Sequence, residues 1–441
     1  MNNRFDNIKG TYDYLPEKQI LREQIKHTLE SVFVKYGFAP AETPIICKYD
    51  LLASKYSEGA DILNEMYTLS DQGKRKLGLR YDLTITFSKL ISSNPSVVLP
   101  FKRYEIGKVF RDGPVKLGRN REFTQCDTDV VGIKSIMAEA EYMTMTGEAY
   151  KKLGLDIEIE FNNRKLLSGL IMLIFGELPE EITRKCIMLI DKFAKLTEVE
   201  LQNEFETIGI DAEKLEILKE LLRLDYENLK SKLAVIGTNQ LINEGWKEID
   251  ELYEYLADCD VLENMKFAPY LARGIDVYTG TVWEVFLKDR KIENQDFNLS
   301  IGGGGRYDKI ITTFMDDGNE YPAIGMSFGL DVIYEILNLK NRNKSNPIVE
   351  LFIIPIEASV KSFEFATKLR AVGLKVEIDK TARKLKKSMN FANKMNIPFV
   401  VVIGQNEIVS GNVKVKNMST GLNIEVAMND IETIKKIVEE K

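Results

Sequence analysis

The chain has 441 residues, which is too long for one ordinary hydrophobic core and predicts two or three domains. Hydrophobic residues make up 44% and charged residues 29%, and no run approaches the roughly 18 apolar residues of a spanning helix, which excludes a membrane protein. A net charge of −7 argues against a general nucleic-acid binder, because non-specific phosphate binding needs a dense Lys and Arg surface. The first residues contain no apolar export segment, so we expect a cytoplasmic protein.

Cysteine and histidine offer little chemistry in this chain. The four cysteines have no C-x-x-C spacing, which argues against a zinc site and a disulfide framework and predicts buried, reduced thiols. The single histidine, His27, lies in an amphipathic run and is interpreted as a helix-surface residue. We therefore expect neither Ser-His nor Cys-His catalysis, and we assign no metal to protein ligands. Any chemistry must rest on arginine, carboxylate, tyrosine and glutamine side chains and on metal-bound phosphate.

The first 160 residues alternate between helical and strand patterns. Residues 17–36 place apolar side chains at helical spacing and predict a first helix. Strand-like pieces follow near residues 43, 66 and 76. Two longer pieces, 103–111 and 121–132, flank a polar loop at 112–120 and predict a long hairpin. The helical pattern returns at 136–153.

The rest of the chain changes character twice. Residues 163–260 are rich in Leu, Glu and Lys and predict an inserted helical module. Strand-type sequence resumes at 271–287 and 298–310, and residues 323–337 predict a strand followed by a helix. The apolar pattern lapses before Pro347, which indicates a linker, and alternating strands and helices beyond it predict a compact α/β domain.

The predicted hairpin carries the densest set of charges. Arg111, Lys116, Arg119 and Arg121 would repel one another unless an anion such as polyphosphate lies among them. Phe123 could stack on a base, and Gln125 and Asp129 share its strand face because strand side chains alternate. The alternative is a charged surface hairpin without a ligand.

Two further sets contain polar groups suited to an amino acid. Asp82 and Thr84 are expected on one strand face, where a carboxylate beside a hydroxyl suits an ammonium group, and the alternative is a strand-end turn with a helix cap. Arg273, in an apolar strand context, must find an anion or a carboxylate, and Tyr278 adds a phenol. An internal Arg–Asp pair would explain the second set equally well.

Two segments are compatible with ligands but not specific. Glycines 302–305 permit close approach to the backbone, which fits a ligand or a tight bend, and they match no P-loop. Residues 370–396 contain eight Lys or Arg against two acidic residues. This basic stretch fits selective RNA docking or a solvated helix face.

Taken in order, these segments resemble the histidyl-tRNA synthetase family nearly end to end. The matching landmarks are IKGTYDYLP (8–16), Pro44, LRYDLT (79–84), FRDGPVKLGRNREFTQCD (110–127), ARGIDVYTGTVWE (272–284), GGGGRYD (302–308) and AIGMSFGLD (323–331). The tail pieces LFIIPI, KVEID, RKLKK and FVVVIG are similar to the family's anticodon-binding domain.

The resemblance implies an α+β fold: a class II antiparallel sheet with flanking helices, an inserted helical domain and a C-terminal α/β anticodon-binding domain. The implied bounds are 1–160 and 263–340 for the catalytic domain, 161–262 for the insertion, 341–347 for a linker and 348–441 for the anticodon-binding domain. It further implies activation of L-histidine with ATP and Mg²⁺, transfer to histidine tRNA, and a homodimer.

Site roles are carried over by position. Arg111, Gln125 and Arg273 would be catalytic, with both arginines at the α-phosphate. Histidine would be bound by Asp82, Thr84, Arg111, Gln125, Asp129, Arg273, Val277, Tyr278 and Tyr307. ATP would be bound by Arg111, Arg121, Glu122, Phe123 and Arg306.

The sequence departs from the family pattern at two positions. Val332 stands where the third motif has an ATP-binding arginine, and Val277 stands where the first of two tyrosines is usual. A cation borrowed from Arg306 or the hairpin loop could compensate for Val332. Two alternatives stay open: a histidine-binding regulatory subunit of ATP phosphoribosyltransferase, and a paralogue that activates an amino acid for another acceptor.

Overall fold

The structure is a computed structural model that describes residues 4–54, 61–116, 118–193, 196–273, 277–293, 295–340, 347–381 and 383–440. Its backbone contacts divide the chain into two compact units. Unit 1 contains Met1–Asp13 and Leu21–Lys340, and unit 2 contains Tyr14–Ile20 and Asn341–Lys441. None of the helices in the described ranges has the length and apolar content needed to cross a membrane.

Unit 1 is built on a sheet whose described strands run in the order β1-β5-β6-β13-β12-β9-β7-β8, with only the β1·β5 and β7·β8 pairs parallel. The predicted hairpin is present in this sheet, next to the short edge strand β1, since β5 and β6 pair from Phe101↔Val131 to Phe110↔Glu122. The strands are β1 (Ala39–Pro40), β5 (Phe101–Phe110), β6 (Glu122–Val131), β7 (Ile157–Asn163), β8 (Met265–Phe267), β9 (Thr281–Leu287), β12 (Gly302–Arg306) and β13 (Ala323–Gly329). The predicted antiparallel-rich sheet with flanking helices is confirmed.

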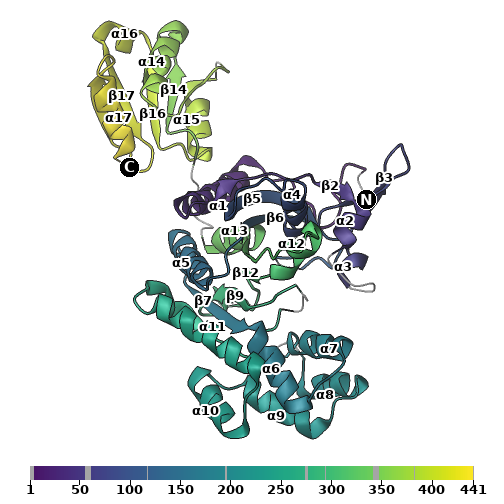
Figure 1. Cartoon of the computed structure of the whole chain (residues 1–441). Helices are drawn as coiled ribbons and strands as arrows, with labels where there is room; N and C mark the ends of the chain where they lie inside the picture. The colour runs from purple at the N-terminus through teal and green to yellow at the C-terminus, as the bar shows by residue number, and fades with distance from the viewer. Residues whose placement is uncertain are drawn as a thin grey trace. The chain divides into compact units, whose positions relative to one another are not determined.

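Helices cover one face of this sheet (Figure 1). They are α1 (Pro16–Lys35), α5 (Met137–Lys152) and α13 (Leu330–Lys340). The ring of Phe33 on α1 lies 5.7 Å from Tyr104 of β5 and 5.4 Å from Phe328 of β13, and Tyr142 on α5 lies 5.8 Å from Trp283 of β9. Because successive strand side chains point to opposite faces, the residues between these aromatic ones face the other side. The apolar core therefore lies under the helices, and polar groups are left to the second face.

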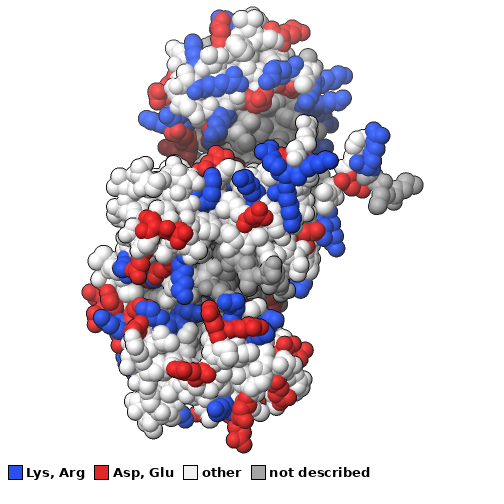
Figure 2. Space-filling view, turned by 45° about the vertical axis from the view of Figure 1, so that its right-hand side comes forward, with Lys and Arg blue, Asp and Glu red and all other residues white. Residues whose placement is uncertain are grey.

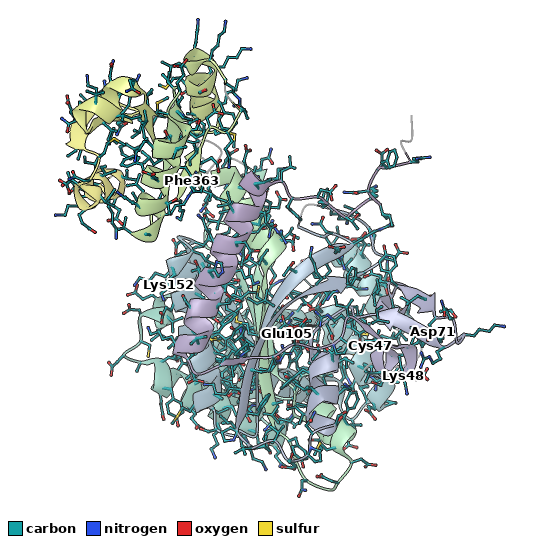
Figure 3. All side chains as sticks on the ribbon, turned by 90° about the horizontal axis from the view of Figure 1, so that it is seen from above. Cys47, Lys48, Asp71, Glu105, Lys152 and Phe363 are labelled. Carbon is teal, nitrogen blue, oxygen red and sulfur yellow. The ribbon has the colours of Figure 1, made fainter. Side chains whose placement is uncertain are left out.

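A small sheet of three described strands adjoins the end of the hairpin, where the N–H of Phe110 donates to the carbonyl of Arg80 at 2.9 Å. Its strands are β2 (Ile46–Lys48), β4 (Lys76–Leu79) and β3 (Thr68–Ser70). Cys47 and Lys48 are labelled on it in Figure 3, and Glu105 is labelled on the main sheet. The short elements nearby are α2 (Tyr49–Ala53), α3 (Asp61–Asn64), α4 (Thr84–Ser92) and α12 (Asp308–Met315). The strands β10 (Lys291–Ile292) and β11 (Gln295–Asp296) form a separate pair elsewhere in unit 1, with β10 next to α13.

A group of helices separates β7 from β8 in the sequence, as predicted for residues 163–260 (Figure 1). They are α6 (Arg164–Phe175), α7 (Glu180–Ile190), α8 (Glu198–Thr207), α9 (Ala212–Leu222), α10 (Tyr226–Ile236), α11 (Gln240–Leu256) and the 3₁₀ turn η1 (Asp260–Asn264). Side-chain caps begin most of them, because Asx and Thr oxygens accept the free N–H groups of a first turn. These caps are Asn163, Thr197, Asp211, Asp225 and Asn239. The exact bounds of the inserted domain stay a prediction.

Unit 2 is an α/β layer structure, as expected from the alternating pattern of the tail. Its strands run in the order β15-β14-β16-β17-β18, with the first three parallel. Leu351 and Val401 face one apolar cluster and Phe352 and Val400 face another, so both sides of the sheet are covered. The elements are β14 (Leu351–Pro355), α14 (Ser359–Ala371), β15 (Val376–Ile378), α15 (Leu385–Lys394), β16 (Phe399–Ile403), α16 (Gln405–Ser410), β17 (Asn412–Asn417), β18 (Asn423–Ala427) and α17 (Ile431–Glu439).

Some strand predictions were wrong. Of the predicted strand 271–287 only Thr281–Leu287 is strand, and Arg273 lies in a loop with φ +43°. Apolar content alone cannot distinguish a buried loop from a strand, and here the loop is buried over the sheet. Residues 274–276 lie outside the described residues, as does most of the predicted linker.

The glycine strand β12 gives a test of the packing. A Cβ on Gly304 would approach the carbonyl of Gly325 and lie 2.6 Å from the Trp283 ring, whereas at Gly329 the nearest atom is 3.5 Å away. We expect Gly304→Ala to lower Tm clearly, since overpacking costs about 1–3 kcal/mol, and Gly329→Ala to leave it nearly unchanged. Thermal unfolding measures both, and equal melting temperatures would contradict this packing.

Candidate functional site

The second face of the main sheet carries a row of side chains along β6. Phe123, Gln125, Asp127 and Asp129 alternate with residues that face the helices, so these four point to the same side. Gln125 Nε2 donates to Ser327 Oγ of β13 at 3.1 Å, and Ser327 is the cross-strand partner of Asp127. The strand register thus brings together three residues that the sequence analysis singled out.

Glycines on β12 leave room for two more of the predicted residues. An added Cβ at Gly303 would lie 2.6 Å from Arg273 Nη1, and one at Gly305 would lie 2.7 Å from the ring of Tyr278. The sequence analysis expected a ligand or a bend at these glycines. The structure shows instead that the side chains of Arg273 and Tyr278 lie close against the backbone of this strand.

Asp129 is fixed by two neighbours. Arg103 Nη2 lies 2.7 Å from its Oδ2, and the hydroxyl of Tyr307 donates a hydrogen bond to Oδ1. Its carboxylate also occupies the space that a side chain at position 325 would fill, which Gly325 leaves open. Burial raises the pKa of Asp129, while Arg103 and Tyr307 favour the ionised form.

A buried ion network beneath this row was not anticipated from the sequence. Arg80 Nη1 lies 2.6 Å from Glu105 Oε1, and Arg103 Nη1 lies 3.6 Å from Glu105 Oε2. The hydroxyl of Thr43 also donates to Glu105, and all three charged groups are at most 3% exposed. The available signal was the spacing Arg103-x-Glu105 inside an otherwise apolar strand, because buried charges occur in pairs.

Asp82 and Thr84 do not share a strand face, so that expectation was wrong. Strand β4 ends at Leu79, and Thr84 begins α4. Asp82 Oδ1 accepts from the N–H of Ile85 at 3.1 Å, which is the capping geometry of the alternative interpretation. Asp82 nevertheless lies near the row on β6. Its negative charge there contributes to the raised pKa of both Asp127 and Asp129.

Arg273 is held over the sheet by weak contacts. Its Nη1 donates to the carbonyl of Trp283 at 3.4 Å, Glu284 Oε1 lies 3.7 Å from Nε, and the ring of Tyr278 lies 5.5 Å from the guanidinium. Burial disfavours the charged guanidinium, but Tyr278, Glu284 and Asp191 outweigh it and raise the pKa of Arg273. The guanidinium stays charged without a close carboxylate, which suits an anionic ligand.

The hairpin end of the row is cationic and aromatic. The guanidinium of Arg111 lies 5.1 Å from the Phe123 ring centroid, and both residues line a cavity with Arg119 and the loop glycines Gly113 and Gly118. No ion pair of Arg119 occurs in the described part of the chain, so this cation is available to a ligand.

Two of the predicted nucleotide-binding side chains are already paired at this end. Arg121 Nη2 lies 3.1 Å from Asp112, and Glu122 lies 2.8 Å from Lys108 Nζ. Arg121 and Glu122 can therefore take their predicted roles only if they leave Asp112 and Lys108 and contact the nucleotide instead.

Arg306 is not brought to the pocket face. Arg306 points to the helix side of β12, where Glu139 of α5 accepts from its Nε at 2.5 Å and from its Nη2 at 2.7 Å. This placement argues against Arg306 as a substitute cation for ATP. Val277 packs in an apolar cluster, and Val332 lies against the hairpin loop, where a Cβ on Gly118 would be 3.2 Å from it.

No group of three or more His, Cys, Asp or Glu side chains in the described ranges is arranged to hold a metal ion. Two carboxylates of the pocket face, Glu105 and Asp129, form ion pairs with Arg80 and Arg103 instead. The arrangement therefore offers a polar, partly anionic floor at one end and an exposed set of guanidinium groups at the other.

The comparisons with known proteins cover nearly the whole chain. The family described as histidyl-tRNA synthetase matches residues 10–333, and the family described as anticodon binding domain matches residues 350–440. Histidine–tRNA ligase 1 from Bacillus cereus is 46% identical over 96% of this chain and 98% of its own length.

Solved structures also resemble this chain over most of its length. A histidyl-tRNA synthetase from a Nostoc species has a TM-score of 0.84 at 26% identity, over 99% of this chain and 100% of that chain. A Bacillus halodurans protein described as an ATP phosphoribosyltransferase regulatory subunit/histidyl-tRNA synthetase has a TM-score of 0.75 at 20% identity, over 92% of this chain and 99% of that chain, and shares the fold. With its first 333 residues matched almost completely and a relative at 46% identity over nearly its full length, the chain belongs to the histidyl-tRNA synthetase family.

Proposed function

We propose that the chain joins L-histidine to ATP to form histidyl-adenylate and transfers the histidine to its tRNA. The observation that carries this proposal is the order of side chains along one face of β6. From Phe123 to Asp129 the strand extends about 20 Å, at roughly 3.4 Å per residue. This length suits a nucleotide at the hairpin end and an amino acid at the Asp129 end.

The amino acid would lie at the end of the row where carboxylates gather. Asp129 and Asp82 would face its ammonium group, and Gln125 would offer its free amide oxygen. Tyr278, flat against Gly305, would meet the imidazole ring. Thr84 and Tyr307 would complete this end, the second through its hydrogen bond to Asp129.

The nucleotide would lie at the hairpin end. Phe123 would stack on adenine, and Arg111 above it would hold the α-phosphate. Arg273 would approach the α-phosphate and the substrate carboxylate from the opposite side, because it lies over β12. Arg119 and Arg121 would meet the outer phosphates, and Mg²⁺ would be held by those phosphates.

The chemistry then needs no protein nucleophile. The histidine carboxylate attacks the α-phosphorus, a new C–O–P bond forms, and the bond to pyrophosphate breaks. In the second step a ribose hydroxyl of the tRNA attacks the acyl carbon and AMP leaves. The protein contributes positioning and stabilisation of negative charge, and orientation alone can supply roughly 7–11 kcal/mol of a barrier.

Unit 2 would bind the tRNA through its basic surface. Lys and Arg side chains cover much of the side of this unit turned to the viewer at the top of Figure 2. The basic stretch 370–396 supplies part of this charge, and Lys386 and Lys387 on α15 are exposed. A homodimer, a cytoplasmic location and the domain bounds given above belong to the same proposal.

A second candidate function is the histidine-binding regulatory subunit. It is favoured by Val332, since an aliphatic side chain beside the hairpin loop cannot bind phosphate. The complete unit 2 and the intact arginine at position 273 oppose it. The two functions differ in one measurable step, which is the formation of the adenylate.

We expect the purified chain to exchange labelled pyrophosphate into ATP only when histidine is present. The physical reason is that adenylate formation is reversible and needs the substrate carboxylate as nucleophile. Omission of histidine and its replacement by other amino acids are the controls. Histidine binding without any exchange would refute the ligase and support the regulatory subunit.

We expect Arg273→Ala to lower the exchange rate about 100-fold or more, as for the removal of a group that stabilises developing charge. Tm should change little, because the contacts of this guanidinium to the protein are long. Arg223→Ala, which removes an exposed arginine on the inserted helices, is the matched control and should keep full activity. Wild-type exchange by the Arg273→Ala variant would remove this residue from the mechanism.

A further inference from the structure

Buried charges on the pocket face of the sheet do not balance. Arg80 and Arg103 form close ion pairs with Glu105 and Asp129, at 2.6 and 2.7 Å. Asp127 lies in the same ladder, opposite Glu105 of β5 and two residues before Asp129, and is 4% exposed. No cation of the described residues is within ion-pair distance of it. The sequence analysis did not assign a role to this third carboxylate.

Besides Asp129 Oδ2, which has Arg103 as its ion-pair partner, two buried oxygens at this place lack a hydrogen-bond donor in the described part of the chain. They are Asp127 Oδ1 and Gln125 Oε1, which lie on one strand face. The amide of Gln125 is oriented by its Nε2, which donates to Ser327, so Oε1 is left for another donor. Buried polar groups are nearly always satisfied, and two adjacent free acceptors therefore indicate a ligand with N–H or O–H groups.

The protonation of Asp127 reflects the same imbalance. Burial and the neighbouring carboxylate of Asp129 raise its pKa from 3.8 to about 7, with a smaller contribution from Asp82. Arg103 and a hydrogen bond from Ser327 favour the ionised form but do not outweigh these effects. Without a ligand, this carboxyl group therefore keeps its proton up to near-neutral pH.

We propose that Asp127 is a further binding residue of the amino-acid pocket, whose Oδ1 accepts hydrogen bonds from the substrate's α-ammonium group together with Oε1 of Gln125. The inference rests on the proposed function, because it requires an amino acid in this pocket. An ammonium group brings three N–H donors and a full positive charge, which match two free acceptors and one uncompensated carboxylate. A neutral imidazole would bring a single N–H and leave the charge unpaired.

Binding should then be linked to a proton. The groups that face Asp127 are Arg103 and Glu105 from β5, Gln125 and Asp129 on its own strand, Ser327 from β13, and Asp82 before α4. Among these, only Arg103 favours ionisation by its charge. An arriving ammonium group adds a second cation, so Asp127 ionises on binding and releases its proton to solvent below about pH 7.

The test compares histidine with imidazolepropionate, which lacks the α-amino group, by calorimetry on the wild-type chain and on Asp127→Asn. The variant keeps the volume and removes the charge. We expect about tenfold weaker binding of histidine, the loss typical of a hydrogen bond to a charged group, and no loss for imidazolepropionate. At about pH 6.5, titration in two buffers of different ionisation enthalpy should detect more proton release for the wild type than for the variant, for which only the imidazole of the ligand itself can lose a proton.

Thr128→Val is the matched control, since Thr128 is buried on the opposite face of the same strand. Three results for Asp127→Asn would overturn the assignment. They are equal losses of affinity for histidine and imidazolepropionate, a rise in KM for ATP as large as the loss of histidine affinity, and an unchanged affinity for histidine. If Asp127→Asn does not fold, Ser327→Ala replaces it: its histidine binding should be weak at about pH 6.5 and recover at about pH 8.5, and a defect without recovery overturns the assignment.

The two proposals fail differently. A wild-type chain that binds histidine without pyrophosphate exchange refutes the ligase and leaves the Asp127 comparison intact. A wild-type chain that does not bind histidine refutes both.

The ligand-free protein provides an independent check through its stability. The folded-state pKa of Asp127 is raised, so its ionisation opposes folding as the pH rises above its ordinary value, with the full penalty reached above about pH 7. We expect the Tm of Asp127→Asn to exceed that of the wild type at about pH 8 and the difference to shrink towards about pH 5. A constant difference across this range would contradict the burial of an uncompensated acid.

Discussion

A single buried arginine compensates the negative charges on the acidic face of the sheet. Arg103 lies on β5 between Glu105 and Asp129, and its guanidinium is 3.6 Å and 2.7 Å from their carboxylates. Without it, these carboxylates and Asp127 would lie within one low-dielectric region with Arg80 as the nearest buried cation. An uncompensated buried charge is among the most destabilising features a fold can contain. The pocket can therefore be acidic enough for an ammonium group only because one arginine beneath it is permanently charged.

The arrangement of the site also requires free space directly against the backbone of β12, which its glycines provide. Arg273 and Tyr278 come from a loop, yet both rest on backbone at Gly303 and Gly305, where any side chain would displace them. The strand β12 thus offers bare backbone between β9 and β13, against which both side chains rest. The short glycine run therefore determines how close Arg273 and Tyr278 lie to the sheet.

The sequence predicted more of the fold than of the site. Period-two patterns identified β5 and β6, and helical spacing identified α1, because these elements bury one face each and the pattern is local. The loop position of Arg273 was missed, because a buried loop and a strand can have the same apolar composition. For Asp82 the helix cap was left open as the alternative, and the expected strand face was wrong. The network of Arg80, Arg103 and Glu105 was not predicted either. The spacing Arg103-x-Glu105 indicates buried charges, but their partner Arg80 is distant in sequence and a single sequence does not identify it. Family resemblance supplied the roles of Arg111 and Arg273, which spacing alone had left open.

Asp331 and Val332 show how two adjacent positions of one landmark can have different physical roles. Asp331 accepts from Arg22 Nη1 at 2.6 Å and from the N–H of Thr124 at 2.6 Å. The pairing of β6 with β13 ends at Gln125, so the N–H of Thr124 needs this acceptor, and α1 is joined to the sheet by the same carboxylate. Val332, one residue later, packs against Gly118 of the hairpin loop. The acid is thus required by the fold, whereas the neighbouring position faces the hairpin loop and can be uncharged without disturbing that anchor. Replacement of the family's arginine by valine therefore changes the binding chemistry of the loop and leaves the sheet that carries Asp127 and Asp129 intact.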